Sequence, residues 1–271
     1  MQDRSVPRRA VMIVAAVVAM LAPIAATADA SPRPERTGSV ARLVAAPLAV
    51  DLAGVVNART FAAYTTVSGL RISDKVIRSA NLSALKPSGV RRLQREQLRS
   101  IIDLRTALEV ALQPDVRVPG ATRTHDDVLG ATPPTNLIDL TSAYRSFITD
   151  PGARAAFGSA LRTIGATTAR GGTVLFHCSA GKDRTGWLSA VLLTILGVDK
   201  AVVNADYLAS NIYRHASPND PVNGVNLGLL DSSFATANRV YGSFDNYVHR
   251  GLGLSARDIA TLKRSLLLPS I

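Results

Sequence analysis

One stretch constrains the fold more than any other: an apolar, β-rich run that leads through a polar loop into an apolar helix. The run covers residues 173–176 and follows two glycines, and the polar loop occupies residues 177–183. Apolar residues then recur at helical spacing over 184–196 and stop at Gly197, a residue type common at helix ends. This order places the free N–H groups and the positive end of the helix dipole against the loop. The sequence therefore predicts an anion-binding loop.

Cys178 and Arg184 are separated by five residues in this loop. A loop of that length wraps a tetrahedral dianion, with backbone N–H groups on its oxygens and the guanidinium gripping two of them. Gly181 permits the positive φ that such a tight curl requires. The helix N-terminus favours the thiolate form of Cys178, which would then attack a bound phosphoryl group. We therefore expect Cys178 and Arg184 to be catalytic and to act through a phosphocysteine intermediate.

The other residues of the loop are candidates for substrate binding and support. We expect His177 to orient the loop and the following residues to bind substrate: Ser179, Ala180, Gly181, Lys182 and Thr185. A lone cysteine is more often a small buried apolar residue, but charged residues and glycine in the next positions do not suit an apolar core. A nucleotide-binding G-x4-G-K-[ST] loop fails on spacing, because it needs glycine at Phe176 and a hydroxyl residue at Asp183.

The segment His177-Cys178-Ser179-Ala180-Gly181-Lys182-Asp183-Arg184-Thr185-Gly186 resembles the signature of the bacterial secreted tyrosine phosphatases. Further segments agree in their order along the chain: 78–82, 101–105 with Glu109, and 206–208. The resemblance covers most of the chain from about residue 53 onward. It implies a cysteine-based protein-tyrosine phosphatase that also acts on phosphoserine or phosphothreonine, or on phosphoinositides. It implies no cofactor, and no His, Cys or carboxylate cluster has metal-ligand spacing.

The resemblance also implies that the general acid is Asp183, inside the loop itself. Many tyrosine phosphatases instead take this acid from a separate mobile loop, so Asp126, Asp127 and Asp139 remain alternatives. Asp103 and Arg105 follow an apolar strand, where polar residues at the carboxyl end point to the ligand crevice. An ion pair that braces the cysteine loop explains these two residues equally well.

Strands alternate with helices along the chain, which indicates an α/β fold with a mostly parallel central sheet flanked by helices. The segment from 110 to 136 is rich in Pro, Gly and Thr and reads as long loops. Helices are expected over 140–169, with a break at Asp150-Pro151-Gly152, and over 199–214. No repeat and no second composition class appear, so we expect residues 50–271 to form one phosphatase domain.

The first thirty residues have the features of a secretory signal peptide. Arg4, Arg8 and Arg9 precede an apolar run, and Ala28-Asp29-Ala30 fits a cleavage site. The run is shorter than the roughly 20 residues that span a bilayer, so a stable membrane anchor is disfavoured. Residues 31–49 read as a flexible lead-in. We therefore expect a protein that is secreted or held in the cell envelope.

The charge of the chain favours anionic partners. The full chain carries a formal net charge of +11. Removal of the expected signal peptide, residues 1–30, takes away three basic and two acidic residues and leaves a net charge of +10. Phosphorylated proteins and phosphoinositides fit this charge, whereas no nucleic-acid-binding motif accompanies it. Two rival functions remain: a catalytically silent phosphate-binding module, and a sulfur-transfer enzyme with a similar cysteine loop. The first would usually lack Cys178 or Arg184, and Lys182-Asp183 favours phosphate over sulfur transfer.

Overall fold

The computed structural model describes residues 46–130, 140–217, 219–220 and 222–269. In this part of the chain, six strands form a central sheet in the order β1-β2-β4-β7-β5-β6. Their bounds are β1 Leu48–Ala49, β2 Arg59–Thr60, β4 Val76–Ser79, β7 Thr173–His177, β5 Leu98–Asp103 and β6 Thr122–His125. The pairs β4-β7, β7-β5 and β5-β6 are parallel, whereas β1-β2 and β2-β4 are antiparallel. The predicted mostly parallel sheet is confirmed, with antiparallel strands at one edge.

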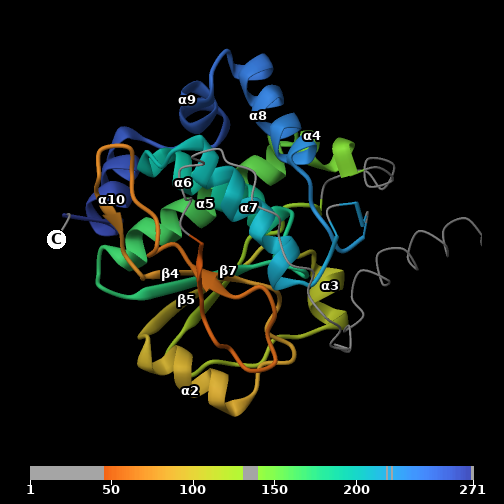
Figure 1. Cartoon of the computed structure of the whole chain (residues 1–271), viewed down its shortest axis with the longest axis vertical. Coiled ribbons are helices and arrows are strands. Elements are labelled where there is room, and N and C mark those ends of the chain that lie inside the picture. Colours follow the sequence, from red (N-terminus) through yellow and green to blue (C-terminus); the bar gives the residue numbers. More distant parts are fainter. Residues whose placement is uncertain (1–45, 131–139, 218, 221, 270–271) are drawn as a thin grey trace, which may run out of the picture.

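Both faces of the sheet are covered by an apolar core, and successive side chains of β7 point alternately into the two cores. Val174 and Phe176 pack into the larger core, and Leu175 packs into the smaller one. In Figure 1, α5 (Pro151–Thr168), α6 (Arg184–Leu196) and α10 (Ala256–Leu266) lie above the sheet and α2 (Pro87–Arg95) lies below it. The helices predicted on both faces are present, but most of the apolar burial lies on the α5–α6 face.

The remaining helices extend the larger core. They are α4 (Leu140–Thr149), α7 (Lys200–Tyr213), α8 (Leu227–Tyr241), α9 (Phe244–Asn246) and a π-helical turn over Tyr247–Gly251. The break between α4 and α5 lies where the sequence predicts it, since the Asp150 side chain accepts from Ala153 N–H and Pro151 starts α5. A small second sheet joins β3 (Arg71–Ile72) to β8 (Leu267–Leu268) near the end of the chain.

The expectation of long loops from 110 to 136 is only partly right. A short helix, α3 (Ala107–Leu112), reaches into this stretch, and β6 pairs with β5 inside it. Residues Thr122–His125 are mostly exposed and carry no apolar alternation, so the edge strand has no sequence signal.

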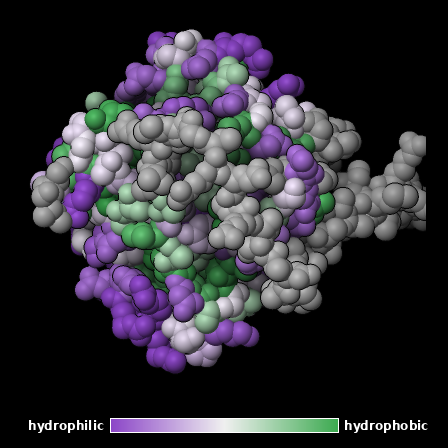
Figure 2. Space-filling model, viewed as in Figure 1, coloured by the Kyte–Doolittle hydropathy of each residue, from purple (hydrophilic) through white to green (hydrophobic). Residues whose placement is uncertain are grey.

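The visible surface is strongly polar over two regions. Figure 2 shows hydrophilic residues gathered over α2 and over the outer end of the α8–α9 region. On α2 these include Arg91, Arg92 and Arg95, all exposed, opposite the buried Leu93. Among the described residues, no helix is long and apolar enough to cross a membrane.

Candidate active site

The predicted anion-binding loop connects the carboxyl end of β7 to the first turn of α6. Cys178 directly follows β7 and is 2% exposed, and Arg184 is the first residue of α6. Gly181 has φ +68°, and an added Cβ would lie 2.4 Å from the backbone oxygen of Ser79. Glycine is therefore required here for two reasons, its backbone conformation and the close approach of β4.

Side chains from distant segments hold the carbonyl groups of the loop on its outer side. Asn81 Nδ2 donates to Ser179 O over 3.0 Å, and Arg214 Nη1 donates to Ala180 O over 3.1 Å. Gly181 O accepts from Asn57 Nδ2 at 2.8 Å and from Arg78 Nη2 at 2.9 Å. Because successive carbonyls are fixed outward, the amides of the loop are left for a ligand. In the described part of the chain, no backbone N–H of residues 179–183 donates a hydrogen bond.

Arg184 is oriented by a carboxylate from α3. Its Nη1 and Nη2 each lie 2.7 Å from an oxygen of Glu109, and Nη1 also donates to Leu104 O over 3.3 Å. Burial alone would raise the pKa of Glu109, but Arg184 and the Ser179 hydroxyl stabilise the carboxylate and lower the pKa to about 2. Burial alone would lower the pKa of Arg184, but the ion pair with Glu109 outweighs this effect and raises it. Both side chains are therefore charged at neutral pH, in a fixed bidentate geometry.

The two hydroxyl residues of the loop make different contacts. Ser179 Oγ donates to Glu109 Oε1 over 2.5 Å, so it orients the partner of Arg184. Thr185 is fully buried, and its hydroxyl has no hydrogen-bond partner among the described residues. Ala180 contributes only backbone groups, and its carbonyl is one of those held outward.

Asp183 and Lys182 face a buried pair of tyrosines and the loop that follows α7. The Tyr144 hydroxyl donates to Asp183 Oδ1 over 2.8 Å and lies 2.6 Å from the Tyr207 hydroxyl. Lys182 is 1% exposed, and its Nζ lies 3.3 Å from Asp183 Oδ2 and 3.0 Å from Gly224 O. In this structure the charge of Lys182 is thus directed to Asp183 and to a backbone carbonyl.

A buried ion-pair network lies behind the loop. Asp206, on α7, pairs with Arg78 Nη1 at 2.6 Å and with Arg59 Nε at 3.1 Å. Burial alone would raise the pKa of Asp206, but the two arginines lower it. Burial, together with the charge of Arg59, lowers the pKa of Arg78 to about 10. Because Arg78 also binds Gly181 O, this network couples α7 to the anion-binding loop.

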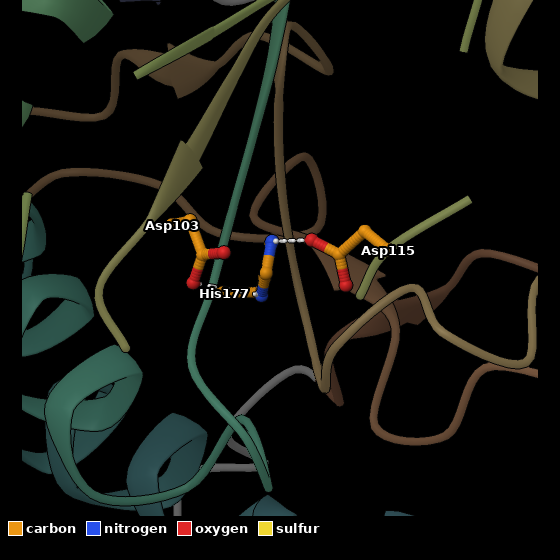
Figure 3. Close-up of side chains that lie close together, drawn as sticks. All are labelled: Asp103, Asp115 and His177. Carbon is orange, nitrogen blue, oxygen red and sulfur yellow. Dashed lines mark ion pairs between the residues drawn. The ribbon is translucent and has the colours of Figure 1, made fainter. Parts of the chain in front are cut away.

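The predicted supporting residues form a second network at the carboxyl ends of β5 and β7. Figure 3 shows the His177 ring between Asp103 and Asp115, with Nε2 3.1 Å from Asp115 Oδ2. Arg105 binds both oxygens of Asp103, through Nε at 2.8 Å and Nη2 at 2.7 Å. All of these side chains are almost fully buried. Asp103 and Arg105 therefore pair with each other. The link from this pair to Cys178 is indirect, through the neighbouring residue His177, whose Nδ1 lies 3.8 Å from Asp103 Oδ1.

This cluster has the composition of a metal site, since ligand atoms of Asp103, Asp115 and His177 lie within 4.8 Å of one another. Sequence spacing gave no sign of it. Arg123 Nη2, however, lies 2.5 Å from an oxygen of each aspartate, and Arg105 binds both as well. A cation here would have to displace two arginines, so the donor set does not fit a metal ion.

The alternative acids lie in different environments. Asp127 Oδ1 accepts from the N–H groups of Leu129 and Gly130, as a turn residue does. Burial raises the pKa of Asp126, which interacts with Ser159 on α5. In the described part of the chain, no hydrogen bond or ion pair joins either residue to the cysteine loop. Asp139 lies outside the described residues.

Several residues at the loop were not assigned a place by sequence reasoning. They are Asn57, Tyr144 and Arg214, which contact residues 123, 39 and 34 positions away, respectively. None of them lies in a local pattern that carries chemistry, so no signal in a single sequence could have found them.

The chain is similar to several known proteins. The family model described as "Tyrosine phosphatase family" matches residues 50–268. "Triple specificity protein phosphatase PtpB" from Mycobacterium tuberculosis is 28% identical, over 80% of this chain and 98% of that protein. A "Tyrosine-protein phosphatase" from Nostoc commune is also 28% identical, over 88% of this chain and 91% of that protein. Among solved structures, P. aeruginosa TpbA is 20% identical over 79% of this chain and 99% of that chain, with a TM-score of 0.41.

The family match covers the cysteine loop and every side chain placed around it, and it confirms the resemblance seen in the sequence. It excludes the rival sulfur-transfer enzyme. The chain belongs to the tyrosine phosphatase family and is a protein-tyrosine phosphatase.

Proposed function

We propose that Cys178 is the nucleophile and that Arg184 and the loop amides bind the phosphoryl group. The thiolate forms a bond to phosphorus while the bond to the leaving oxygen breaks. The leaving oxygen takes a proton from Asp183, which becomes a carboxylate. Water then attacks the phosphocysteine, gives its proton back to Asp183, and releases phosphate and the thiolate.

The observation that best supports this proposal is that the backbone carbonyl groups of the cysteine loop point outward, away from the expected phosphate site. Asn57, Arg78, Asn81 and Arg214 fix the loop so that its amides have no partner among the described residues. Such a cradle needs no reorganisation when charge develops on the phosphoryl oxygens. Glu109 takes the Nη1–Nη2 edge of Arg184, which leaves the Nε–H and the second Nη2–H on the adjacent edge to bind two phosphoryl oxygens.

The proposal is tested with two substitutions at the loop. Cys178→Ser should bind phosphate but lose turnover of para-nitrophenyl phosphate, because a serine hydroxyl is not ionised. Arg184→Lys should also lose turnover, since a point charge cannot replace the planar fork. Activity of Cys178→Ser within tenfold of wild type would contradict the mechanism, and an inactive wild type would indicate a silent phosphate-binding module.

For Asp183 the proposed role is general acid. Its place at the start of α6, directly before Arg184, supports this role. Asp183→Asn should slow substrates with poor leaving groups most and para-nitrophenyl phosphate least. A loss that ignores the leaving group would return the role to another aspartate.

We propose substrates beyond phosphotyrosine, namely phosphoserine or phosphothreonine peptides and phosphoinositides. The name of the mycobacterial relative and the basic charge of the chain support this breadth. Lys182 adds a cation to the loop, although it must release Gly224 O before it can meet a second phosphate. Lys182→Ala should then reduce phosphoinositide turnover more than peptide turnover, and equal losses would remove Lys182 from lipid selection.

We also propose that the protein is exported by an N-terminal signal peptide. Residues 1–30, which lie outside the described part, have the pattern of a signal peptide, and the family match begins at residue 50. We propose one catalytic domain over 50–271 that also includes β1, because Leu48 and Ala49 pair with β2 and therefore belong to the sheet rather than to the expected lead-in over 31–49. Mature protein from the medium or cell envelope should begin near Ser31, and protein that retains residues 1–30 in a membrane fraction would indicate an anchor.

A further inference from the structure

Asp183 occupies the N-cap position of α6 but does not cap the helix. Its side chain makes no hydrogen bond to the N–H groups of the first turn, although aspartate is among the best capping residues. The carboxylate instead points to Tyr144, which comes from a helix 39 positions earlier in the chain.

Tyr144 is held rigidly where it meets Asp183. It is fully buried, its ring centroid lies 5.0 Å from that of Phe147, and its backbone oxygen accepts from Ser233 Oγ at 2.9 Å. Tyr207 is fixed as well, since its ring packs against the backbone of α6 at Gly186, where an added Cβ would lie 3.0 Å from the ring. Both hydroxyls therefore have defined positions relative to the first turn of α6.

The direction of the hydrogen bonds follows from counting protons. Tyr144 has one proton, which it donates to Asp183 Oδ1, so the Tyr207 hydroxyl must donate to the Tyr144 oxygen. Burial raises the pKa of both tyrosines well above the ordinary value, so both keep their protons at neutral pH. The chain of donors thus ends on one carboxylate oxygen, Oδ1.

The second oxygen of Asp183 is less constrained. Lys182 Nζ lies 3.3 Å from Oδ2 and 3.4 Å from Oδ1, so it does not distinguish the two oxygens, and within the described residues Oδ2 has no other contact. A proton on Oδ2 leaves the Tyr144 bond to Oδ1 intact, whereas a proton on Oδ1 would compete with it. The two oxygens of the carboxyl group therefore differ in the reaction that they can perform.

We infer that Tyr144, backed by Tyr207, is a positioning residue that holds Asp183 Oδ1 and leaves Oδ2 to exchange the proton with the leaving group and with water. This inference rests on the proposed role of Asp183 as general acid. As the bond between phosphorus and the leaving oxygen breaks, the proton passes from Oδ2 to that oxygen. The resulting carboxylate keeps its hydrogen bond from Tyr144, so its orientation is preserved for the second step.

The experiment measures kcat/KM for aryl phosphates of graded leaving-group pKa with Tyr144→Phe. We expect about a tenfold loss for the poorest leaving groups and little loss for para-nitrophenyl phosphate, because only proton transfer is affected. The charged groups that also act on Asp183 are Lys182, Arg184 and Arg214, and all stay in place.

The matched control is Tyr247→Phe. Tyr247 is also fully buried, and its hydroxyl accepts from Trp187 Nε1 at 3.2 Å, away from Asp183. This variant should retain the leaving-group dependence of wild type. If Tyr144→Phe does not fold, Tyr207→Phe tests the inference in its place. Removal of this second donor should lower kcat/KM about threefold for the poorest leaving groups and little for para-nitrophenyl phosphate.

The Asp183→Asn background separates the two proposals. Tyr144→Phe should add nothing further there, because its effect passes through the carboxylate. The same loss in both backgrounds, or an equal loss on all leaving groups, would overturn the role of Tyr144. A wild-type leaving-group dependence in Asp183→Asn alone would instead refute Asp183 as the acid.

Discussion

Glu109 and Arg184 form a bidentate pair, with both Nη–O distances at 2.7 Å, at the point where α3 meets the first turn of α6. The pair fixes the plane of the guanidinium, which a phosphate needs for recognition by two parallel hydrogen bonds. Glu109 in turn is held by the capping box of α3, since its carboxylate accepts from Thr106 N–H at 2.8 Å. A local helix-capping motif thus positions the principal cation of the active site.

Glu109→Gln should lower kcat/KM for para-nitrophenyl phosphate about a hundredfold, because a neutral amide cannot accept both guanidinium bonds and Arg184 loses its fixed orientation. The loss should appear in both kcat and KM, since Arg184 is proposed to bind the ground state and the transition state. The control is Glu96→Gln, which removes a partly exposed ion pair with Arg92 on the outer side of α2. Comparable losses in the two variants would show that orientation of Arg184 is not the cause.

Stability should fall at acidic pH in part through Glu109. The pKa of Glu109 is lowered from 4.5 to about 2 in the folded protein, so its stabilising contribution is present above 4.5 and is lost as the pH falls toward 2. The shift corresponds to on the order of 3 kcal/mol. Asp103, Asp115 and Asp206 have lowered pKa values too and contribute in the same direction. Urea unfolding at a series of pH values should therefore show a shallower acid limb for Glu109→Gln than for wild type, and parallel limbs would contradict this assignment.

Gly181→Ala and Gly197→Ala make a matched pair. Both glycines have positive φ, +68° and +83°, so each alanine meets the same backbone penalty of about 1 kcal/mol. Only Gly181 has a neighbour in the way, the Ser79 oxygen at 2.4 Å, whereas nothing lies within 4 Å of Gly197. Gly181→Ala should therefore displace the loop and lower kcat/KM about tenfold or more, while Gly197→Ala should affect stability alone. Equal turnover of the two variants would show that the loop tolerates the displacement.

Much of the fold and the centre of the site could be predicted from the sequence because their signals are local. The stretch 173–197 encodes a strand, a glycine-containing turn and a helix that ends at a glycine, and the structure has each of them at the predicted place. The break before Pro151 is equally local. In contrast, β6 owes its pairing to a parallel neighbour rather than to its own side chains, so it was missed.

The supporting side chains of the site could not be predicted for a physical reason. Asn57 and Arg214 fix two loop carbonyls, but they are ordinary polar residues in their own segments and acquire this role only through long-range packing. Tyr144 is similar, since its periodicity marks a core position on α4 and nothing local shows that its hydroxyl meets Asp183. Chemistry concentrated in one loop is visible in a sequence, whereas chemistry assembled by tertiary contacts is not.

Asp206→Asn should destabilise the protein more than any surface ion-pair variant. Asp206 is 1% exposed and neutralises Arg59 and Arg78, both fully buried, so its loss leaves two buried cations with a neutral partner. Breaking a buried pair of this kind costs about 3–5 kcal/mol, measured here as the free energy of unfolding in urea. The control is Asp231→Asn, which removes an exposed pair with Lys200 at 3.4 Å and should cost less than about 1 kcal/mol.

Turnover by the folded fraction of Asp206→Asn should fall as well, because Arg78 joins this network to Gly181 O at 2.9 Å. An Arg78 side chain released from Asp206 no longer fixes that carbonyl outward, and the loop amides lose part of their preorganisation. The activity loss should therefore persist at temperatures where the variant is fully folded by circular dichroism. Full activity under those conditions would mean that the network stabilises the fold without shaping the phosphate cradle, and that Asn57 alone suffices to hold Gly181 O.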